Sequence, residues 1–281
     1  MYREEKRIFS YFDKKFLNEV LGIAISKDNQ EEAYVKLKEV LKVKKLSDLN
    51  ELSGEVFCKR NINKTISEKE IILKNAWINL ALMLAEGQVV NDFKLNSLLK
   101  VINTLKSLSL NQNNDLKEKI TFLLNKVGIK FVVLPYLPLS NIRGFVKYLK
   151  DEGRYVLAIN NCGKLIDKFF FTLFHEIAHI ILDNIDEMKI EDIYITYEKV
   201  KEENNEVKEI EEKADIFAKD MLIHPDRYEA FIRRNNFTIR SMLFLANKEK
   251  VDIGIVIGRL QKDGYLSYSQ FNNYKRKIFI I

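Results

Sequence analysis

The stretch Phe169–Leu182 reads FFFTLFHEIAHIIL and contains a His-Glu-x-x-His pattern. On a helix its two histidines, His175 and His179, lie four residues apart on one face, so that one ring nitrogen of each can reach a single ion. Glu176 points about a quarter-turn away from His175. That direction puts its carboxylate beside the open coordination position rather than on the metal. The pattern therefore predicts a metal-binding helix.

The rest of this stretch is almost entirely apolar, as in a helix that is buried on nearly every side. Polar side chains in such a helix need partners, because an unpaired buried polar group is costly. One divalent cation would supply a partner to all three. The alternative is a chance match, with two ordinary core histidines and an ion-paired glutamate. The chain has only three histidines in 281 residues, and two of them fall at this spacing, which favours the metal site.

Length and composition describe an ordinary globular protein. A chain of 281 residues can form one large domain or two. The charged first residues, MYREEKRIFSYF, lack the apolar core of a signal peptide, and no apolar run is long enough to span a bilayer. Two cysteines, Cys58 and Cys162, are too few for a disulfide framework or a zinc knuckle. We expect a cytoplasmic protein with reduced thiols and no membrane contact.

The net charge of +6 is unevenly distributed. The segment Asp186–Asp215 contains twelve acidic and five basic residues, so the rest of the chain is basic. A basic bulk is compatible with contact to nucleic acid, but the chain has no dense basic stripe. Charge alone therefore does not identify a nucleic-acid-binding protein.

Amphipathic spacing predicts helices throughout the first half of the chain. A capping box at Ser67–Glu70 opens one of them, which extends to about Glu86, where Gly87 can end it. Small helices in series could form a helix-turn-helix, but we see no turn signature, and a plain bundle is expected. The other predicted helices of this half are Arg3–Ile23, Glu31–Val43, Ser47–Leu52, Asp92–Leu108 and Asp115–Val127.

Strands are predicted just before the metal helix. The β-branched run Ile129–Leu134 is followed by Ile142–Leu149 and Arg154–Ile159, and residues 150–153 between the last two read as a hairpin turn. This order predicts a small antiparallel sheet. Helices are expected again after the metal helix, at Tyr197–Phe217, Asp226–Arg234, Ile239–Asn247, Ile253–Lys262 and Tyr268–Lys277.

A catalytic zinc site needs a third protein ligand. Glu211 and Asp215 share one flank of the predicted acidic helix at i, i+4 spacing, if Ala214, Phe217 and Ala218 pack inward. We predict that Glu211 binds the metal and that Asp215 accepts a hydrogen bond from a ligand imidazole. The alternative is that both acidic side chains face water, as most do on a lysine-rich helix.

Several segments together resemble one known family, the ImmA/IrrE metallopeptidases, which are similar to gluzincin-type zinc peptidases. The segments are Asp167–His179, the pattern Glu211-x-x-Ala214-Asp215-x-Phe217-Ala218, and Leu222-Ile223-x-Pro225. Further likeness is found at Gly128-Ile129, Leu137-Pro138 and Gly144, and at Ile255–Gln261. The resemblance covers about Leu116–Lys277.

By this resemblance the ligands of a Zn2+ ion are His175, His179 and Glu211, and Glu176 is the general base. The implied activity is that of a hydrolase, a metalloprotease that cleaves a protein partner. The implied partner is a transcriptional repressor or an antitoxin-like protein, in a phage, stress-response or toxin–antitoxin setting that bears on transcription regulation. The family motif lacks the histidine that stands here at position 224, so His224 inherits no role.

The predicted fold class is α+β, with a helical first half followed by a zincin-like domain that holds the sheet and the metal helix. Residues 1–112 would form a helical recognition or docking region, and residues 113–281 the metallopeptidase domain. An oxyanion donor is also expected. His224, Tyr194 and Tyr197 are candidates because they are near the site in sequence.

Two other functions stay open at this point. The chain could be a regulatory or antitoxin protein that uses the metal fold as a binding scaffold without turnover. It could also be a DNA-binding repressor, whose affinity for its promoter would depend on salt. A binding scaffold does not require Glu176, whereas a peptidase needs it as a base. A substitution at Glu176 therefore distinguishes the two functions.

Overall fold

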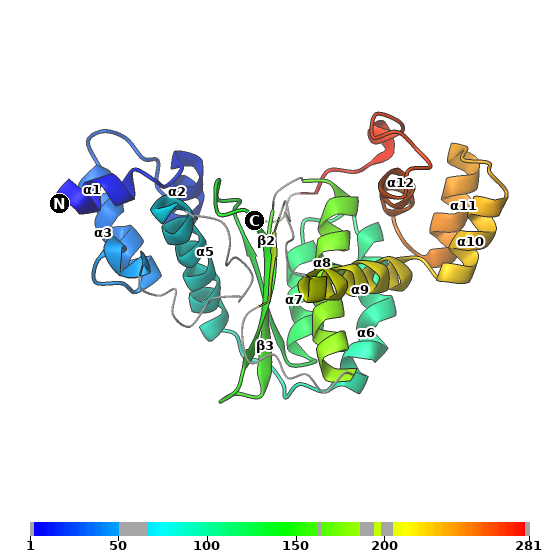
Figure 1. The fold of residues 1–281 in the computed structure, drawn as a ribbon, viewed down its shortest axis with the longest axis horizontal. Helices are drawn as coiled ribbons and strands as arrows, with labels where there is room; N and C mark the ends of the chain where they lie inside the picture. Colours follow the sequence, from blue (N-terminus) through cyan, green and yellow to red (C-terminus); the bar gives the residue numbers. More distant parts are fainter. Residues whose placement is uncertain (1–2, 51–66, 162–163, 186–193, 198–204, 279–281) are drawn as a thin grey trace.

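The computed structural model describes residues 3–50, 67–161, 164–185, 194–197 and 205–278, and of residues 194, 197 and 205–207 only the backbone. The described residues form eleven α-helices and one four-stranded sheet, so the chain is α+β. Helices lie on both sides of the sheet (Figure 1). None of the described helices combines the length and the apolarity that a membrane span requires.

The sheet has the order β1-β3-β2-β4 and is mixed. Strand β1 (Ile129–Leu134) pairs parallel with β3 (Arg154–Asn160), while β2 (Ile142–Leu149) is antiparallel to both β3 and β4 (Tyr194–Tyr197). The prediction of an antiparallel sheet was therefore wrong. After the hairpin, β3 lies between β1 and β2, so it is parallel to β1 and antiparallel to β2. The local sequence does not determine this strand order.

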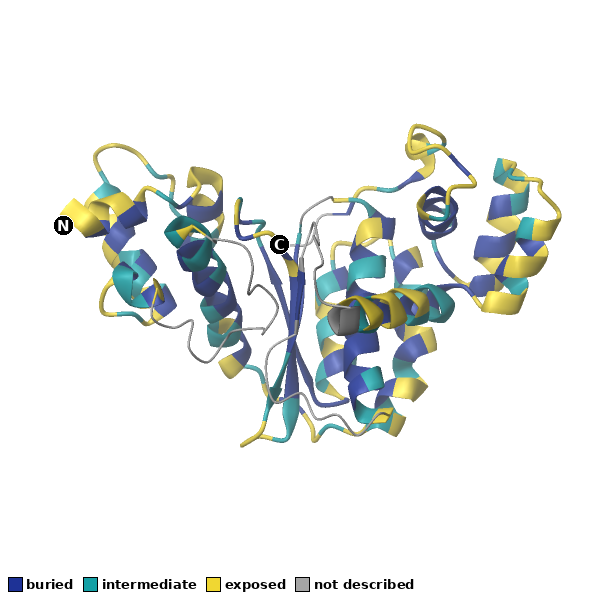
Figure 2. Cartoon of the chain, in the orientation of Figure 1, coloured by how far each residue is buried: buried dark blue, intermediate teal, exposed yellow. Residues whose placement is uncertain are grey.

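Alternate residues of the strands enter two different cores, because successive side chains point to opposite faces. In β1, Phe131 and Val133 contribute to one core, and Val132 and Leu134 to the other. All six residues of β1 are consequently buried, as in a strand covered on both faces. Figure 2 shows the strands buried over most of their length, with exposure concentrated on the outer faces of the helices.

The N-terminal core lies between the sheet and the helices α1 to α5. Trp77 of α5 packs edge-on against Phe145 of β2, with 5.9 Å between ring centroids, and its Nε1 donates to Pro135 O at 3.1 Å. The predicted capping box of α5 is confirmed. The elements of this side are α1 (Arg3–Phe9), α2 (Lys14–Leu21), α3 (Gln30–Leu41), the 3-10 helix η1 (Leu46–Asn50) and α5 (Glu68–Glu86).

One long helix was predicted over residues 3–23, and the structure has two. Asp13 interrupts it because its backbone is extended and its carboxylate accepts from the N–H groups of Lys15 and Phe16, which begins α2. Gly22, with φ of 67°, ends that helix.

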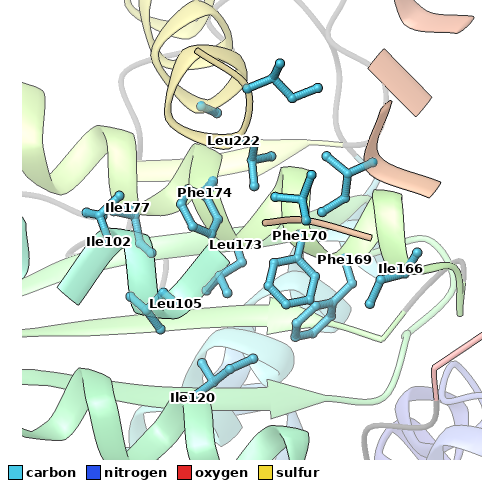
Figure 3. Close-up of a cluster of buried hydrophobic side chains, with 14 of the residues drawn as sticks. Ile102, Leu105, Ile120, Ile166, Phe169, Phe170, Leu173, Phe174, Ile177 and Leu222 are labelled. Atoms are coloured by element: carbon cyan, nitrogen blue, oxygen red, sulfur yellow. The ribbon is translucent and has the colours of Figure 1, made fainter. Parts of the chain in front are cut away.

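The site-side core lies on the other face of the sheet. Phe170, Leu173 and Phe174 of α8 fill its centre, and Leu105 of α6 and Ile120 of α7 pack around them (Figure 3). The elements of this side are α6 (Leu95–Ser107), the 3-10 helix η2 (Leu108–Leu110), α7 (Leu116–Asn125), α8 (Ile166–Ile185), α9 (Asn205–Leu222), α10 (Pro225–Arg233), α11 (Ile239–Glu249), α12 (Ile253–Lys262) and the 3-10 helix η3 (Asn272–Tyr274). Helices α6 and α7 both contribute to this core, although the predicted domain boundary at residue 112 falls between them. The division into two domains stays a prediction.

The helix predicted over residues 268–277 was wrong. Only Asn272–Tyr274 forms a short 3-10 helix, and the chain then extends and bridges antiparallel to the segment before α8. Lys275 Nζ donates to Asp167 Oδ2 at 2.6 Å in the first turn of α8, and Ile166 N donates to Arg276 O at 2.9 Å. These tertiary contacts override the local helical spacing.

Candidate metal centre

Helices α8 and α9 pack together and bring three side chains to one point. His175 Nε2 lies 3.0 Å from His179 Nε2 and 3.1 Å from Glu211 Oε2, and His179 Nε2 lies 3.6 Å from Glu211 Oε1. Among the described residues they form a group that could hold a metal ion. The sequence-based grouping of the two histidines with Glu211 is confirmed as a spatial arrangement.

The spacing of these atoms fits a metal. Zinc binds histidine nitrogen and carboxylate oxygen at about 2.0–2.2 Å, so two ligands at a tetrahedral angle lie about 3.4 Å apart. The three separations in the structure fall close to that value. Two imidazoles and one carboxylate form a donor set of catalytic zinc sites. Imidazole and carboxylate also suit other first-row divalent metals, so the donors define the class of ion and not the element.

Asp215 contacts the first histidine from the side away from this group. Its Oδ1 lies 2.8 Å from His175 Nδ1, which leaves Nε2 of the same ring directed at His179 and Glu211. Such a contact sets the tautomer and the orientation of a ligand imidazole. Burial lowers the pKa of His175, but the hydrogen bonds to Asp215 and Glu211 outweigh it and raise that pKa to about 10 in the absence of metal. The predicted contact between Asp215 and an imidazole of the pair is present, and its supporting role at a metal stays a prediction.

Glu176 faces Gly144 of β2 and is fully buried, with 0% of its surface exposed. Neither oxygen of its carboxylate has a hydrogen-bond partner within the part of the chain that the structure describes. Burial is the main reason why the pKa of Glu176 rises to about 8, while the neighbouring charge of His175 lowers it. A buried carboxylate without a donor is unfavourable for folding, so this arrangement calls for a functional explanation.

The strand beneath Glu176 is shaped to admit its carboxylate. Gly144 of β2 faces it so closely that an added Cβ would lie 2.5 Å from Glu176 Oε1 and 2.8 Å from Ala158 O. The sequence analysis noted Gly144 only as part of the family likeness. A glycine inside a strand pattern often marks a close approach, and that signal could have connected it to the site.

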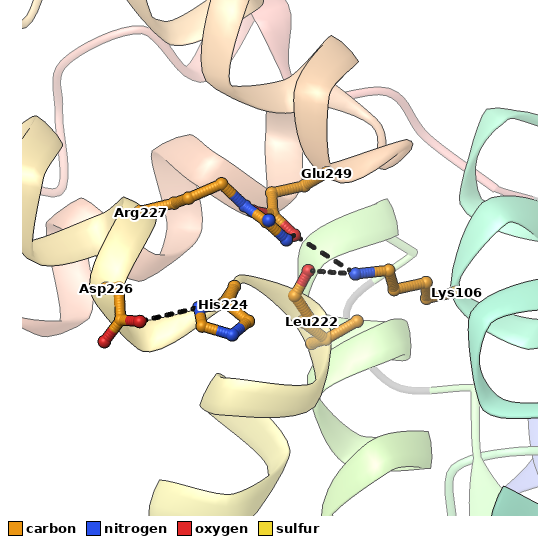
Figure 4. A network of polar contacts seen from close by, with 6 residues as sticks. All are labelled: Lys106, Leu222, His224, Asp226, Arg227 and Glu249. Carbon is orange, nitrogen blue, oxygen red and sulfur yellow. Dashed lines mark hydrogen bonds and ion pairs between the residues drawn. The ribbon is translucent and has the colours of Figure 1, made fainter.

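Of the three other candidates from the sequence, the structure describes the side chain of His224, which lies outside the metal group. His224 caps α10, with 48% of its side chain exposed, and lies 3.9 Å from Asp226 (Figure 4). His224 follows the C-terminal end of α9. The helix rises about 16 Å between Glu211 and Leu222, so the imidazole of His224 is too far from the metal group to donate a hydrogen bond there. Residues 194 and 197 are the two ends of β4, and their side chains lie outside the described residues.

No protein-family model matches the chain, and no curated protein matches it. The resemblance to the ImmA/IrrE family therefore stays a prediction.

Proposed function

We propose that this protein is a zinc-dependent endopeptidase. The observation that carries the proposal is Glu176, a fully buried carboxylate with no donor among the described residues, next to a group of two histidines and one glutamate. Its setting is difficult to explain by stability alone. A zincin-like active site would use it.

His175, His179 and Glu211 would hold the ion, and Asp215 would keep the ring of His175 in place. When bound, a zinc ion lowers the pKa of a water molecule and polarises a carbonyl group. Glu176 then accepts a proton on its carboxylate and delivers it to the nitrogen of the leaving amine. Burial supports this role, because it raises the pKa of Glu176 and so favours a carboxyl group that holds a proton between the two transfers.

The substrate follows from the family resemblance alone. We propose a protein substrate of the repressor or antitoxin type, cleaved in a phage, stress-response or toxin–antitoxin setting. The helices α1 to α5 cover the face of the sheet opposite the metal group, where they could dock a partner without covering the site.

The second candidate is a regulatory protein in which the metal only supports the fold. This reading is favoured by the position of the metal group, because its ligands come from two helices and an ion would link α8 to α9. A purely structural metal would make Glu176 dispensable. The two candidates therefore differ in what they predict for one substitution.

Glu176→Gln tests the proposal, because glutamine has the same shape but cannot act as a base. The zinc-loaded wild type and variant would be incubated with a peptide library and with the regulator encoded beside the gene, and new amino termini would be counted by mass spectrometry. General-base catalysis accounts for about 10²–10⁴-fold in rate, so the variant should retain zinc and lose at least that factor. Equal fragment patterns from both proteins, or none from either, would leave the scaffold as the better reading.

A further inference from the structure

Strand β4 places one side chain on the same face of the sheet as Glu176. Thr196 of β4 lies opposite Gly144 of β2, and Ile195 lies opposite Phe145. Residues directly opposite one another in an antiparallel pair point to the same face. Ile195 and Phe145 both enter the N-terminal core, so Thr196 and Gly144 face the other way, towards α8.

The carboxylate of Glu176 occupies the space on this face that Gly144 leaves open. An ideal Cβ on Gly144 would be 2.5 Å from Oε1 and 3.0 Å from Cδ of Glu176. The register of β2 and β4 shifts between Ile142 and Gly144, which brings Thr196 opposite the glycine. An irregularity of this kind changes the direction in which a side chain points. The hydroxyl of Thr196 and the carboxylate of Glu176 are thus directed to one place.

Both groups are buried and need a partner. The hydroxyl oxygen of Thr196 and the two carboxylate oxygens of Glu176 have no hydrogen-bond partner that the described residues supply. A threonine hydroxyl can rotate to donate, and an ionised carboxylate can only accept, so each group offers what the other lacks.

We propose that Thr196 is a positioning residue for Glu176, whose hydroxyl donates a hydrogen bond to one carboxylate oxygen and directs the other towards the metal group. The role of Thr196 in turnover rests on the proposed peptidase function. The hydrogen bond between Thr196 and Glu176 does not depend on that function. Thr196 acts only through Glu176 and touches no reacting atom. It lies in the acidic segment of the sequence, where no periodic pattern singles it out.

Two substitutions separate the hydroxyl from the shape of the side chain. Thr196→Val keeps the branched shape and removes the donor, whereas Thr196→Ser keeps the donor. We expect Thr196→Val to retain zinc and its melting temperature, to lower kcat about tenfold or more, and to leave KM unchanged. Thr196→Ser should restore most of kcat. In a Glu176→Gln background, Thr196→Val should cause no further loss, because the two residues act as one unit.

Infrared spectroscopy tests the contact without any substrate. The band of the Glu176 carboxyl group is the one that disappears in Glu176→Gln. We expect this band to shift in Thr196→Val and to keep its position in Thr196→Ser, with Thr196→Ala as a second hydroxyl-free variant if valine is not accommodated. An unshifted band in the hydroxyl-free variants overturns the proposal. A shifted band in a protein that cleaves nothing supports the contact and rejects the peptidase.

Discussion

Glu5 and Glu176 are both buried carboxylates, one on each side of the sheet, and their surroundings are opposite. Glu5 accepts hydrogen bonds from the Tyr34 hydroxyl at 2.9 Å, from Leu46 N at 2.8 Å and from Ser47 N at 3.1 Å. Glu176 has no donor of this kind anywhere in the described chain. Burial tends to raise the pKa of Glu5, but its hydrogen bonds lower it, whereas burial raises the pKa of Glu176 to about 8.

The difference distinguishes a carboxylate that holds parts of the fold together from one whose burial is not compensated in this way. The donors to Glu5 come from α3 and η1, so its anion ties α1 to both neighbours. Glu176 is surrounded instead by apolar side chains, a glycine and the metal group. Burial alone therefore does not mark a functional acid.

The largest expected effect comes from removing a ligand of the metal group. His179→Ala should reduce the metal content from about one ion per chain to almost none. The protein should then melt at a lower temperature, because an ion at one hundred times its Kd adds about 2.7 kcal/mol to stability. Elemental analysis and thermal melting measure both quantities.

The control for that experiment is His224→Ala, which removes the exposed histidine that lies outside the metal group. It should keep the metal and the melting temperature. Equal metal content in His179→Ala and wild type would eliminate the site.

Filling the space at Gly144 should harm both function and stability. Gly144→Ala places a methyl group 2.5 Å from the Glu176 carboxylate and 2.8 Å from a backbone oxygen, so we expect a loss of about 1–3 kcal/mol in the free energy of unfolding. Cleavage should fall sharply while zinc is retained. Gly87→Ala is the matched control, since nothing lies within 4 Å of its added Cβ. Urea unfolding of both variants checks the difference, and similar behaviour would contradict the close approach.

The two carboxylates should respond in opposite ways when each is replaced by glutamine. Glu5→Gln puts an amide group among donors and should cost about 1–2 kcal/mol of stability, with zinc binding and cleavage unchanged. Glu176→Gln removes a buried charge without a donor, so the metal-free protein should keep its stability or gain some, although cleavage is lost. Denaturant unfolding of the metal-free proteins measures both changes. If both substitutions destabilise equally, the contrast between the two sites is wrong.

The smallest effect concerns pH. The folded-state pKa of Glu5 is lowered, so its stabilisation is present above its ordinary value of 4.5 and is lost as pH falls through the lowered pKa. The pKa of Glu176 is raised from 4.5 to about 8, so in the metal-free protein its charge reduces stability increasingly as pH rises through that window.

Melting curves from pH 3 to pH 9 can separate the two contributions. The difference in melting temperature between wild type and Glu5→Gln should narrow in acid. The gain in melting temperature from Glu176→Gln should grow between about pH 4.5 and about pH 8 and level off above it. A difference that does not change with pH for either pair would show that these carboxyl groups titrate normally.

Much of the local structure was predictable because hydrophobic periodicity encodes it. The predicted bounds of β1, β2 and α12 agree with the structure at every residue. The grouping of these side chains was also predictable. The spacing of His175 and His179 in α8 and the spacing of Glu211 and Asp215 in α9 are both features of the local sequence. The acidic pair at positions 211 and 215 faces His175 as predicted.

The order of the strands and the short β4 were not predictable, because both depend on distant partners. β4 has only four residues and lies within a charged segment, where no alternation identifies a strand. Without its register opposite β2, Thr196 has no visible connection to Glu176. Residues 275–277 were mistaken for helix for a related reason: their partner is a stretch more than a hundred residues earlier.

That pairing also has a consequence for protein synthesis. Lys275 holds Asp167 in the first turn of the metal helix, and 108 positions separate the two residues. At about 5–20 residues per second, a ribosome needs roughly 5–20 s to make the intervening chain. Throughout that interval the helix that carries both histidines lacks the contact between Lys275 and Asp167. A nascent chain therefore lacks this contact at the start of α8 until translation has passed Lys275.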